Sequence, residues 1–115
     1  MTVRQEFQLI LLQPEGRLDL QGGTALGEQL AALVPQRHDL WVVDLSQVDF
    51  MDSSGLVTLV TGLKAARQSG LRLVLCNLQA PVRLIFELTQ LDSVFEIFES
   101  YDAVLTKVNS LKVAS

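Results

Sequence analysis

The sequence predicts an α/β domain built around a largely parallel sheet. Residues 40–45 and 71–76 are near-continuous apolar runs, as expected of strands that are covered on both faces. Between and after these runs, apolar residues recur at the spacing of amphipathic helices. Alternation of strands and helices is typical of a parallel sheet with helices packed against it. We therefore expect a mixed, largely parallel sheet of four to five strands with about four helices.

The length and composition indicate one globular domain spanning residues 1–115. The chain has 115 residues, of which 49% are apolar and 19% charged, enough for an apolar core. Nine Lys and Arg against 13 Asp and Glu give a net charge of −4, so we expect no nucleic-acid partner. One cysteine and one histidine exclude a disulfide framework within the chain and leave too few ligands for a structural zinc site.

The N-terminal segment does not resemble a membrane span or a signal peptide. Its apolar stretch, Phe7–Leu12, is far shorter than the roughly 20 residues needed to cross a bilayer, and Pro14 follows it. No small-residue cleavage site accompanies it. We expect a cytoplasmic protein that makes no membrane contact.

The elements of the first part follow from apolar runs and helix breakers. Phe7–Leu12 predicts a strand before a Pro-Glu-Gly turn at residues 14–16, and Thr2–Glu6 predicts an edge strand before it. Residues 22–23, both glycine, predict a break and a late start for the first helix. The apolar face of that helix consists of Leu26, Leu30 and Leu33, and the helix ends at Pro35.

The second part begins with the central strand, residues 40–45. Phe50 and Met51 then look like apolar anchors of a connector, and Asp52, Ser53 and Ser54 stand at a helix start. This helix ends at Gly70, and its apolar face consists of Leu56, Leu59, Val60, Leu63 and Ala66. Beyond the strand at 71–76, the sequence predicts a helix with Pro81 in its first turn, a strand over 94–98 and a last helix capped by Ser100.

Two polar segments follow predicted strands and should meet at one edge of the sheet. Asp19 follows the first strand, and Asp52 with Ser53 follows the central one. Partners and ligands of such sheets approach the loops at the carboxyl ends of the strands. We therefore expect these residues to lie near each other, although they are far apart in the sequence.

Several enzyme classes are excluded by spacing. The chain has neither a phosphate-binding G-x-x-x-x-G-K-[ST] loop nor a G-x-S-x-G nucleophile elbow. The single histidine, His38, precedes the central strand and Ser53 follows it, which places them about 20 Å apart. Asp44 could serve as a phosphorelay acceptor, but the required acidic pair and late lysine are missing. Cys76 is expected to be a small buried hydrophobe.

The helix start at residues 52–54 admits two interpretations. Asp and Ser side chains cap helices by accepting hydrogen bonds from free N–H groups, which contributes about 1 kcal/mol. Capping does not need two consecutive serines preceded by two apolar residues. A functional role for this segment therefore stays open beside the structural one.

The segment of residues 44–56 reads Asp-Leu-Ser-Gln-Val-Asp-Phe-Met-Asp-Ser-Ser-Gly-Leu. It resembles the signature of the STAS domain, and most of all that of the anti-sigma-factor antagonists. Residues 16–19, Gly-Arg-Leu-Asp, are similar to the Gly-Glu-Leu-Asp turn of the family. Residues 73–77 and 81–86 resemble the late strand and helix of the family. The resemblance covers nearly the whole chain.

The resemblance implies a phosphorylation switch. In the family, the first serine of Asp-Ser-Ser-Gly is phosphorylated by an anti-sigma factor that is also a serine kinase, and the match places this acceptor at Ser53. Asp19 and Asp52 would border the site, which Ser54 and Gly55 complete. The unphosphorylated form would bind the anti-sigma factor and release a sigma factor, and a serine phosphatase would restore that form. ATP would bind the kinase, so the domain itself would need no cofactor and no catalytic residue.

Two departures from the family pattern concern the edge near Ser53. Arg17 replaces an acidic residue, and could stabilise a phosphate on Ser53 or alter the choice of partner. Residues 22–23 replace the capping residue and alanine that are usual after the turn aspartate. A STAS subunit of another assembly, such as a stressosome or a lipid-transport complex, is the alternative function. An enzyme or small-ligand receptor on the same fold is the third possibility.

Overall fold

A computed structural model describes residues 7–114, with side chains up to residue 109. Its main sheet has the strand order β1 (Leu9–Leu12), β3 (Leu40–Asp44), β5 (Arg72–Cys76) and β6 (Glu96–Phe98), and all neighbouring pairs are parallel. All five residues of β3 are buried, as the apolar run predicts for a central strand. The α/β fold class predicted from the sequence is confirmed.

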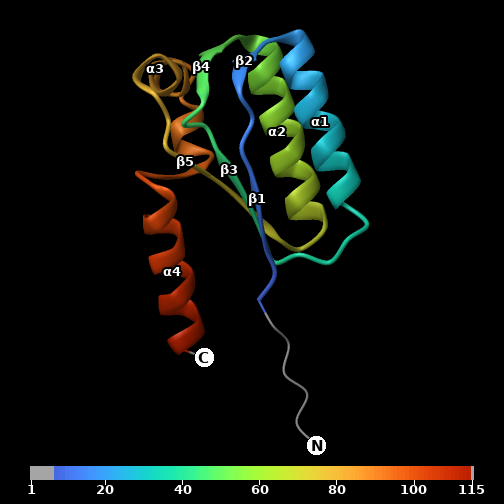
Figure 1. Cartoon of the computed structure of the whole chain (residues 1–115), viewed down its shortest axis with the longest axis vertical. Helices are drawn as coiled ribbons and strands as arrows, with labels where there is room; N and C mark the ends of the chain where they lie inside the picture. The colour runs from blue at the N-terminus through green and yellow to red at the C-terminus, as the bar shows by residue number, and fades with distance from the viewer. Residues whose placement is uncertain (1–6, 115) are drawn as a thin grey trace, which may run out of the picture.

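Two short strands form a second sheet that the sequence analysis missed. β2 (Gly16–Leu18) and β4 (Val48–Met51) pair in parallel and continue the chain beyond β1 and β3. The first had been predicted as a turn and the second as a connector. The small sheet lies at the end of the molecule where α1 and α2 begin, opposite the carboxyl end of α4 (Figure 1).

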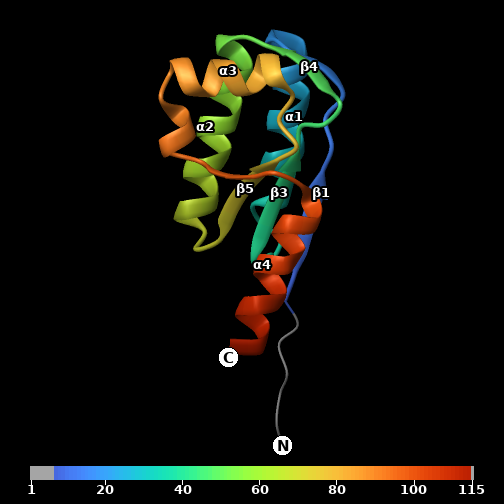
Figure 2. The same ribbon diagram turned by 90° about the vertical axis from the view of Figure 1, so that its left-hand side faces the viewer.

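Helices cover both faces of the main sheet. Side by side on one face lie α1 (Leu20–Leu33) and α2 (Ser53–Gln68), while α3 (Ala80–Leu88) crosses near β4 (Figures 1 and 2). A 3₁₀ turn, η1 (Leu91–Ser93), follows α3. The other face is covered by α4 (Tyr101–Ala114).

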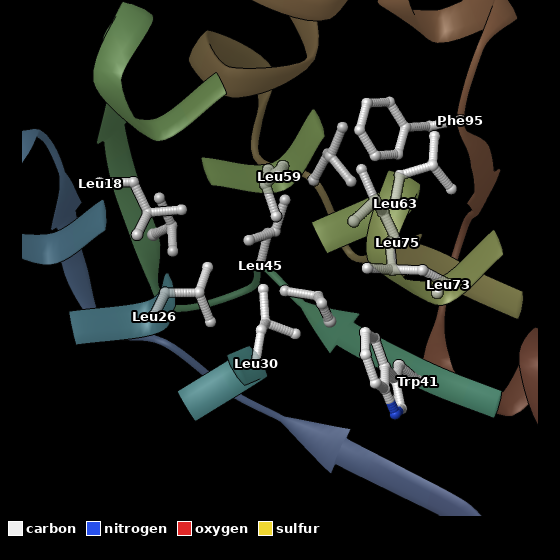
Figure 3. Close-up of a cluster of buried hydrophobic side chains, with 14 of the residues drawn as sticks. Leu18, Leu26, Leu30, Trp41, Leu45, Leu59, Leu63, Leu73, Leu75 and Phe95 are labelled. Atoms are coloured by element: carbon white, nitrogen blue, oxygen red, sulfur yellow. The ribbon is translucent and has the colours of Figure 1, made fainter. Parts of the chain in front are cut away.

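The alternating side chains of the strands build two cores. Between the sheet and the α1–α2 pair lie Trp41 of β3 and Leu73 and Leu75 of β5 (Figure 3). Val43 of β3 belongs to the same buried cluster. The intervening residues of the same strands point to the other face. With Val104 and Val108 of the last helix, they form a second cluster whose other buried members are Leu40, Val42, Val74 and Cys76. A strand buried on both faces reads as a continuous apolar run for this reason.

Helix α1 begins at Leu20, so the predicted break at residues 22–23 is wrong. A Cβ atom on Gly22 would lie 2.0 Å from the backbone oxygen of Arg17, and one on Gly23 would lie 2.9 Å from Oγ1 of Thr58. Both glycines therefore allow close packing inside the helix. The predicted edge strand Thr2–Glu6 lies outside the described residues.

The later element boundaries agree closely with the sequence-based expectations. Gly70 adopts a φ of +76° after the end of α2, and a proline stands in the first turn of α3. The Ser100 hydroxyl accepts a hydrogen bond from the backbone N–H of Ala103 at 3.1 Å, which confirms the cap of α4. Within residues 7–114, no helix has both the length and the apolar character that crossing a bilayer requires.

Candidate functional site

Two strand-to-helix turns stand next to each other at the end of the small sheet. Asp19 joins β2 to α1, and Asp52 joins β4 to α2. Leu18 is the strand partner of Met51, and the backbone N–H of Asp52 donates to the carbonyl oxygen of Leu18 at 3.3 Å. The predicted proximity of Asp19 to the residue 52–53 segment is confirmed, because pairing of β2 with β4 brings the two turns together.

Each aspartate caps the helix that follows it. Oδ1 of Asp19 accepts from the backbone N–H of Gly22 at 3.0 Å. Oδ1 of Asp52 accepts from the N–H groups of Ser54 at 2.9 Å and Gly55 at 3.4 Å. Since Asp52 is the cap, Ser53 is the first helical residue and its exposed side chain is not the capping group. The capping interpretation of residues 52–54 is therefore confirmed, with Asp52 as the capping residue and not Ser53.

The glycine of Asp-Ser-Ser-Gly has a packing role. A Cβ atom on Gly55 would lie 2.3 Å from the carbonyl oxygen of Leu18 and 3.0 Å from Cγ of Met51. The first turn of α2 can thus lie directly on the β2–β4 pair only if residue 55 is glycine. This contact sets the position from which Ser53 projects.

A shallow apolar hollow borders Ser53. Ser53 and Ser54 line a hollow of about 260 Å³ together with Leu20 of α1 and Val57 of α2. Leu20 is 73% exposed and Val57 is 64% exposed, which is unusual for large apolar side chains. A groove of about 290 Å³ continues between α1 and α2 as far as Val34. Neither lining contains an ionisable side chain.

A cation lies on the outer face of the small sheet. Nε of Arg17 is 3.5 Å from Oδ2 of Asp19, and the Arg17 guanidinium carbon lies 4.0 Å from the centre of the Phe50 ring. The hydrogen bond from Gly22 and the Arg17 guanidinium together lower the pKa of Asp19. Arg17 and Asp19 thus already form a charged pair at the start of α1.

Phe50 is exposed, so its predicted role as a buried anchor is wrong, whereas Met51 is buried as predicted. The register of β2 against β4 shifts between Gly16 and Arg17, which leaves Asp49 without a strand partner and sets Phe50 opposite Arg17. A bulge of this kind redirects the following side chain. The anchor prediction treated residues 50–51 as part of a connector, whereas neighbouring side chains of a strand point to opposite faces, so Phe50 points outward when Met51 is buried.

A second polar cluster lies at the carboxyl end of the main sheet and was not predicted. Asp44 is 4% exposed and accepts from Nε2 of Gln13 at 2.9 Å, from the N–H of Ser46 at 2.9 Å and from Nδ2 of Asn77 at 3.2 Å. Burial works to raise the pKa of Asp44, but these hydrogen bonds outweigh it and the pKa lies below its usual value. A carboxylate enclosed in this way is poorly placed to accept a phosphoryl group.

The other residues singled out in the sequence do not join Ser53. His38 precedes β3 at the opposite end of the sheet; it is half-buried, with Nδ1 enclosed and unpaired, rather than fully solvated. Cys76 is buried as predicted, and burial, with a smaller effect of Asp44, raises its pKa to about 11. In the part of the chain that the structure describes, no group of three or more His, Cys, Asp or Glu side chains is arranged to hold a metal.

The strand order and the Asp-Ser-Ser-Gly helix start define the class of STAS-type α/β domains. A family profile described as "Mlab, STAS domain" matches residues 1–99. The chain belongs to the STAS domain family, in the group that contains anti-sigma factor antagonists.

Three known proteins show the range of that similarity. The anti-sigma-B factor antagonist of Bacillus subtilis (strain 168) is 32% identical over 97 residues, which are 84% of this chain and 88% of the relative. The unphosphorylated form of the anti-sigma factor antagonist SpoIIAA has a TM-score of 0.77 at 16% identity and covers 94% of each chain. The STAS domain of a SulP transporter from Vibrio cholerae also has a TM-score of 0.77, at 14% identity, over 97% of this chain and 89% of that one. The fold is therefore shared by regulators and by parts of transporters.

Proposed function

We propose that this protein is an anti-sigma factor antagonist whose binding is switched by phosphorylation of Ser53. The unphosphorylated form binds an anti-sigma factor that is also a serine kinase, and a sigma factor is released. A serine phosphatase returns the phosphorylated form to the binding state. The protein acts in the cytoplasm as a substrate and binding partner, with ATP bound by the kinase and no catalysis of its own.

The observation that carries the proposal is the position of Ser53 directly after the cap of α2. Asp52 already accepts the hydrogen bonds of the first turn, so the exposed Ser53 hydroxyl can be modified without removal of a cap. A phosphate there adds about −1.5 to −2 charges at neutral pH. The free N–H groups and dipole of a helix start favour an anion, so the fold should tolerate the phosphate.

The surroundings of Ser53 explain why the same phosphate would oppose binding. The exposed apolar side chains of Leu20 and Val57 flank the hydroxyl, which suits a partner surface that is apolar and meets a neutral group. A phosphate would bring a strong charge into that contact, close to the carboxylates of Asp19 and Asp52. Desolvation and like-charge repulsion would then weaken docking.

The names of the relatives support the coarser part of the proposal. Proteins named anti-sigma factor antagonists match most of this chain, and one solved relative is described specifically in its unphosphorylated form. The site residues Asp19, Asp52, Ser53, Ser54 and Gly55 come to this chain by the resemblance of its motif.

The first experiment identifies the acceptor. The purified protein is incubated with ATP and the anti-sigma factor encoded in its own genome, and the phosphate is mapped by mass spectrometry. We expect one phosphate, on Ser53. Ser53→Ala should abolish phosphorylation while Ser54→Ala retains at least part of it. A phosphate on Ser54 or Thr58 instead would contradict the assignment.

A STAS subunit of a larger assembly is the second candidate function. The match to a profile described as "Mlab, STAS domain" and the likeness to a transporter domain favour it. In such a subunit the Ser53 surface would hold a permanent partner, and its kinase would be dispensable. Co-purification of a stable complex that is insensitive to Ser53→Asp would support this second function over the switch.

A further inference from the structure

Acidic side chains outnumber basic ones in the segments that lead to Ser53. Along β2, β4 and the turns that flank them, the ionisable residues are Glu15, Arg17, Asp19, Asp49 and Asp52, so Arg17 is the only cation among these residues. The first turns of α1 and α2 contain no acidic residue. Nearby α3 carries Arg83, but its guanidinium is directed to Glu99, at 3.9 Å.

The register of the two strands places Arg17 two residues before the turn that lies beside the start of α2. Arg17 is opposite Phe50, Leu18 is opposite Met51, and the turns of Asp19 and Asp52 follow side by side. Ser53 is therefore one residue beyond Asp52, whose backbone N–H donates to the carbonyl oxygen of Leu18, the residue before Asp19. The Arg17 side chain already extends toward the helix starts, because its Nε lies 3.5 Å from Asp19.

The present contacts of Arg17 leave it free to change partner. Its side chain is 62% exposed, and the ion pair with Asp19 is a single, long contact on a surface where such pairs contribute little. The Phe50 ring supports the guanidinium from one side without consuming its hydrogen-bond donors. A guanidinium binds a phosphate through two parallel hydrogen bonds. The carboxylate of Asp19 is a poorer partner, because one of its oxygens already caps α1.

We propose that Arg17 is the counter-ion of the phosphate on a modified Ser53, and that its guanidinium moves from Asp19 to the phosphate monoester while it stays on the Phe50 ring. The inference rests on the proposed function, because it takes Ser53 as the acceptor. It assigns a regulatory role to Arg17. The cation holds the phosphate against the small sheet and leaves the carboxylate of Asp19 without its neighbouring positive charge.

The test uses the full chain with phosphoserine installed at position 53 during translation, so that no kinase is required. The second pKa of the phosphate is measured by ³¹P NMR titration in the otherwise wild-type chain and in Arg17→Gln and Arg17→Lys. A nearby cation lowers the pKa of an anionic group, so Arg17→Gln should raise the phosphate pKa by about 0.5–1 unit. Arg17→Lys should give a smaller rise, and high salt should shrink the difference.

Arg72→Gln is the matched control. Arg72 is also a surface arginine in an ion pair, with Glu96, but it begins β5 at the opposite end of the sheet. This variant should leave the phosphate titration unchanged. An unchanged titration in Arg17→Gln, or an equal shift in Arg72→Gln, would overturn the role of Arg17.

Failure of this inference can be told from failure of the proposed function. If Ser53→Asp abolishes binding of the anti-sigma factor but Arg17→Gln leaves the phosphate pKa unchanged, only the counter-ion role fails. If the unmodified protein does not bind the anti-sigma factor, the proposed function fails even where the titration shows the predicted shift.

Discussion

Asp44 and Asp52 both stand at the carboxyl end of a strand and accept from the backbone N–H two residues further on, yet their burial and their other partners differ. Asp44 is enclosed, and donors from Gln13, Ser46 and Asn77 occupy its oxygens. Asp52 is half-buried, uses one oxygen to cap α2, and leaves the next residue, Ser53, exposed. The Asp44 carboxylate accepts hydrogen bonds from three segments of the fold, whereas the Asp52 carboxylate caps a helix at the surface.

The comparison shows why location at a strand end is not enough to define a site. A carboxylate with all its neighbours inside the protein contributes to stability and has no capacity left for a partner. At the second position, the carboxylate caps the helix and the adjacent hydroxyl stays exposed. Substitutions at the two ends should therefore separate into losses of stability and losses of binding.

The largest effect is expected at the enclosed end. Asp44→Ala leaves the amides of Gln13 and Asn77 and the N–H of Ser46 without their acceptor, and should lower the free energy of unfolding by about 2–4 kcal/mol. Urea denaturation measures the loss. Asp44→Asn keeps the shape and one acceptor oxygen, so its loss should be smaller. Equal stability of Asp44→Ala and the wild type would remove the contrast between the two ends.

The next effect is expected at the exposed end, in binding. Ser53→Asp should weaken binding of the anti-sigma factor at least tenfold, or about 1.4 kcal/mol, because it places an unpaired charge in the interface. Ser53→Ala should still bind, and titration calorimetry compares the two. The melting temperature of Ser53→Asp should stay within a few degrees of wild type, since a helix start favours a carboxylate.

Ser69→Asp is the control for added charge, because Ser69 lies at the far end of α2. It should bind the anti-sigma factor as wild type does. Equal affinities for Ser53→Ala and Ser53→Asp would refute the switch and favour a STAS subunit with a structural role.

A smaller effect is expected from the caps themselves. Asp52→Ala and Asp19→Ala should each lower the free energy of unfolding by about 1 kcal/mol, because each removes the acceptor of a helix start. Asp19→Asn should retain the cap, yet impair docking or phosphorylation. Chemical denaturation and binding measured on the same variants would separate the two roles of Asp19. A loss of 3 kcal/mol or more, about the size predicted for Asp44→Ala, would show that each cap stabilises more of the fold than the first turn of its helix.

The smallest effect concerns acid. Because the pKa of Asp44 is lower in the folded protein than its ordinary value of 3.8, its ionised form stabilises the fold above that value. This contribution should be lost as the pH falls through the folded-state pKa. The difference in unfolding free energy between wild type and Asp44→Asn should therefore shrink on acidification below pH 3.8. A difference that grew in acid would contradict the assigned hydrogen bonds.

The sequence predicted the main sheet and its helices because long apolar runs and helical spacing report burial directly. It did not predict β2 and β4, which have three and four residues and too little pattern to distinguish them from a turn. Glycines 22 and 23 were misinterpreted, since glycine disfavours helices on average but permits the contacts of α1 with Arg17 and Thr58. Those contacts exist only in the folded chain.

The candidate site was predictable in part for the same reason. Asp19, Asp52 and Ser53 were brought together by topology alone, because strands that run in parallel end at one edge. The Phe50 side chain was placed wrongly because the segment was predicted as a connector, whereas in strand β4 Phe50 and Met51 point to opposite faces. The cluster around Asp44 joins residues from three separate segments, and no local pattern announces such a contact.

The close approach of Gly55 to Leu18 bears on how motifs of this kind should be used to search genomes. A Cβ at residue 55 would meet backbone, so a glycine there follows from the way α2 lies on β2 and is required whether or not the neighbouring serine is modified. A search pattern that gains its score from this glycine detects the architecture. Under the proposed function, the identity of residue 53, read together with residues 17 and 19, would discriminate a phosphorylated regulator from a scaffold with the same backbone.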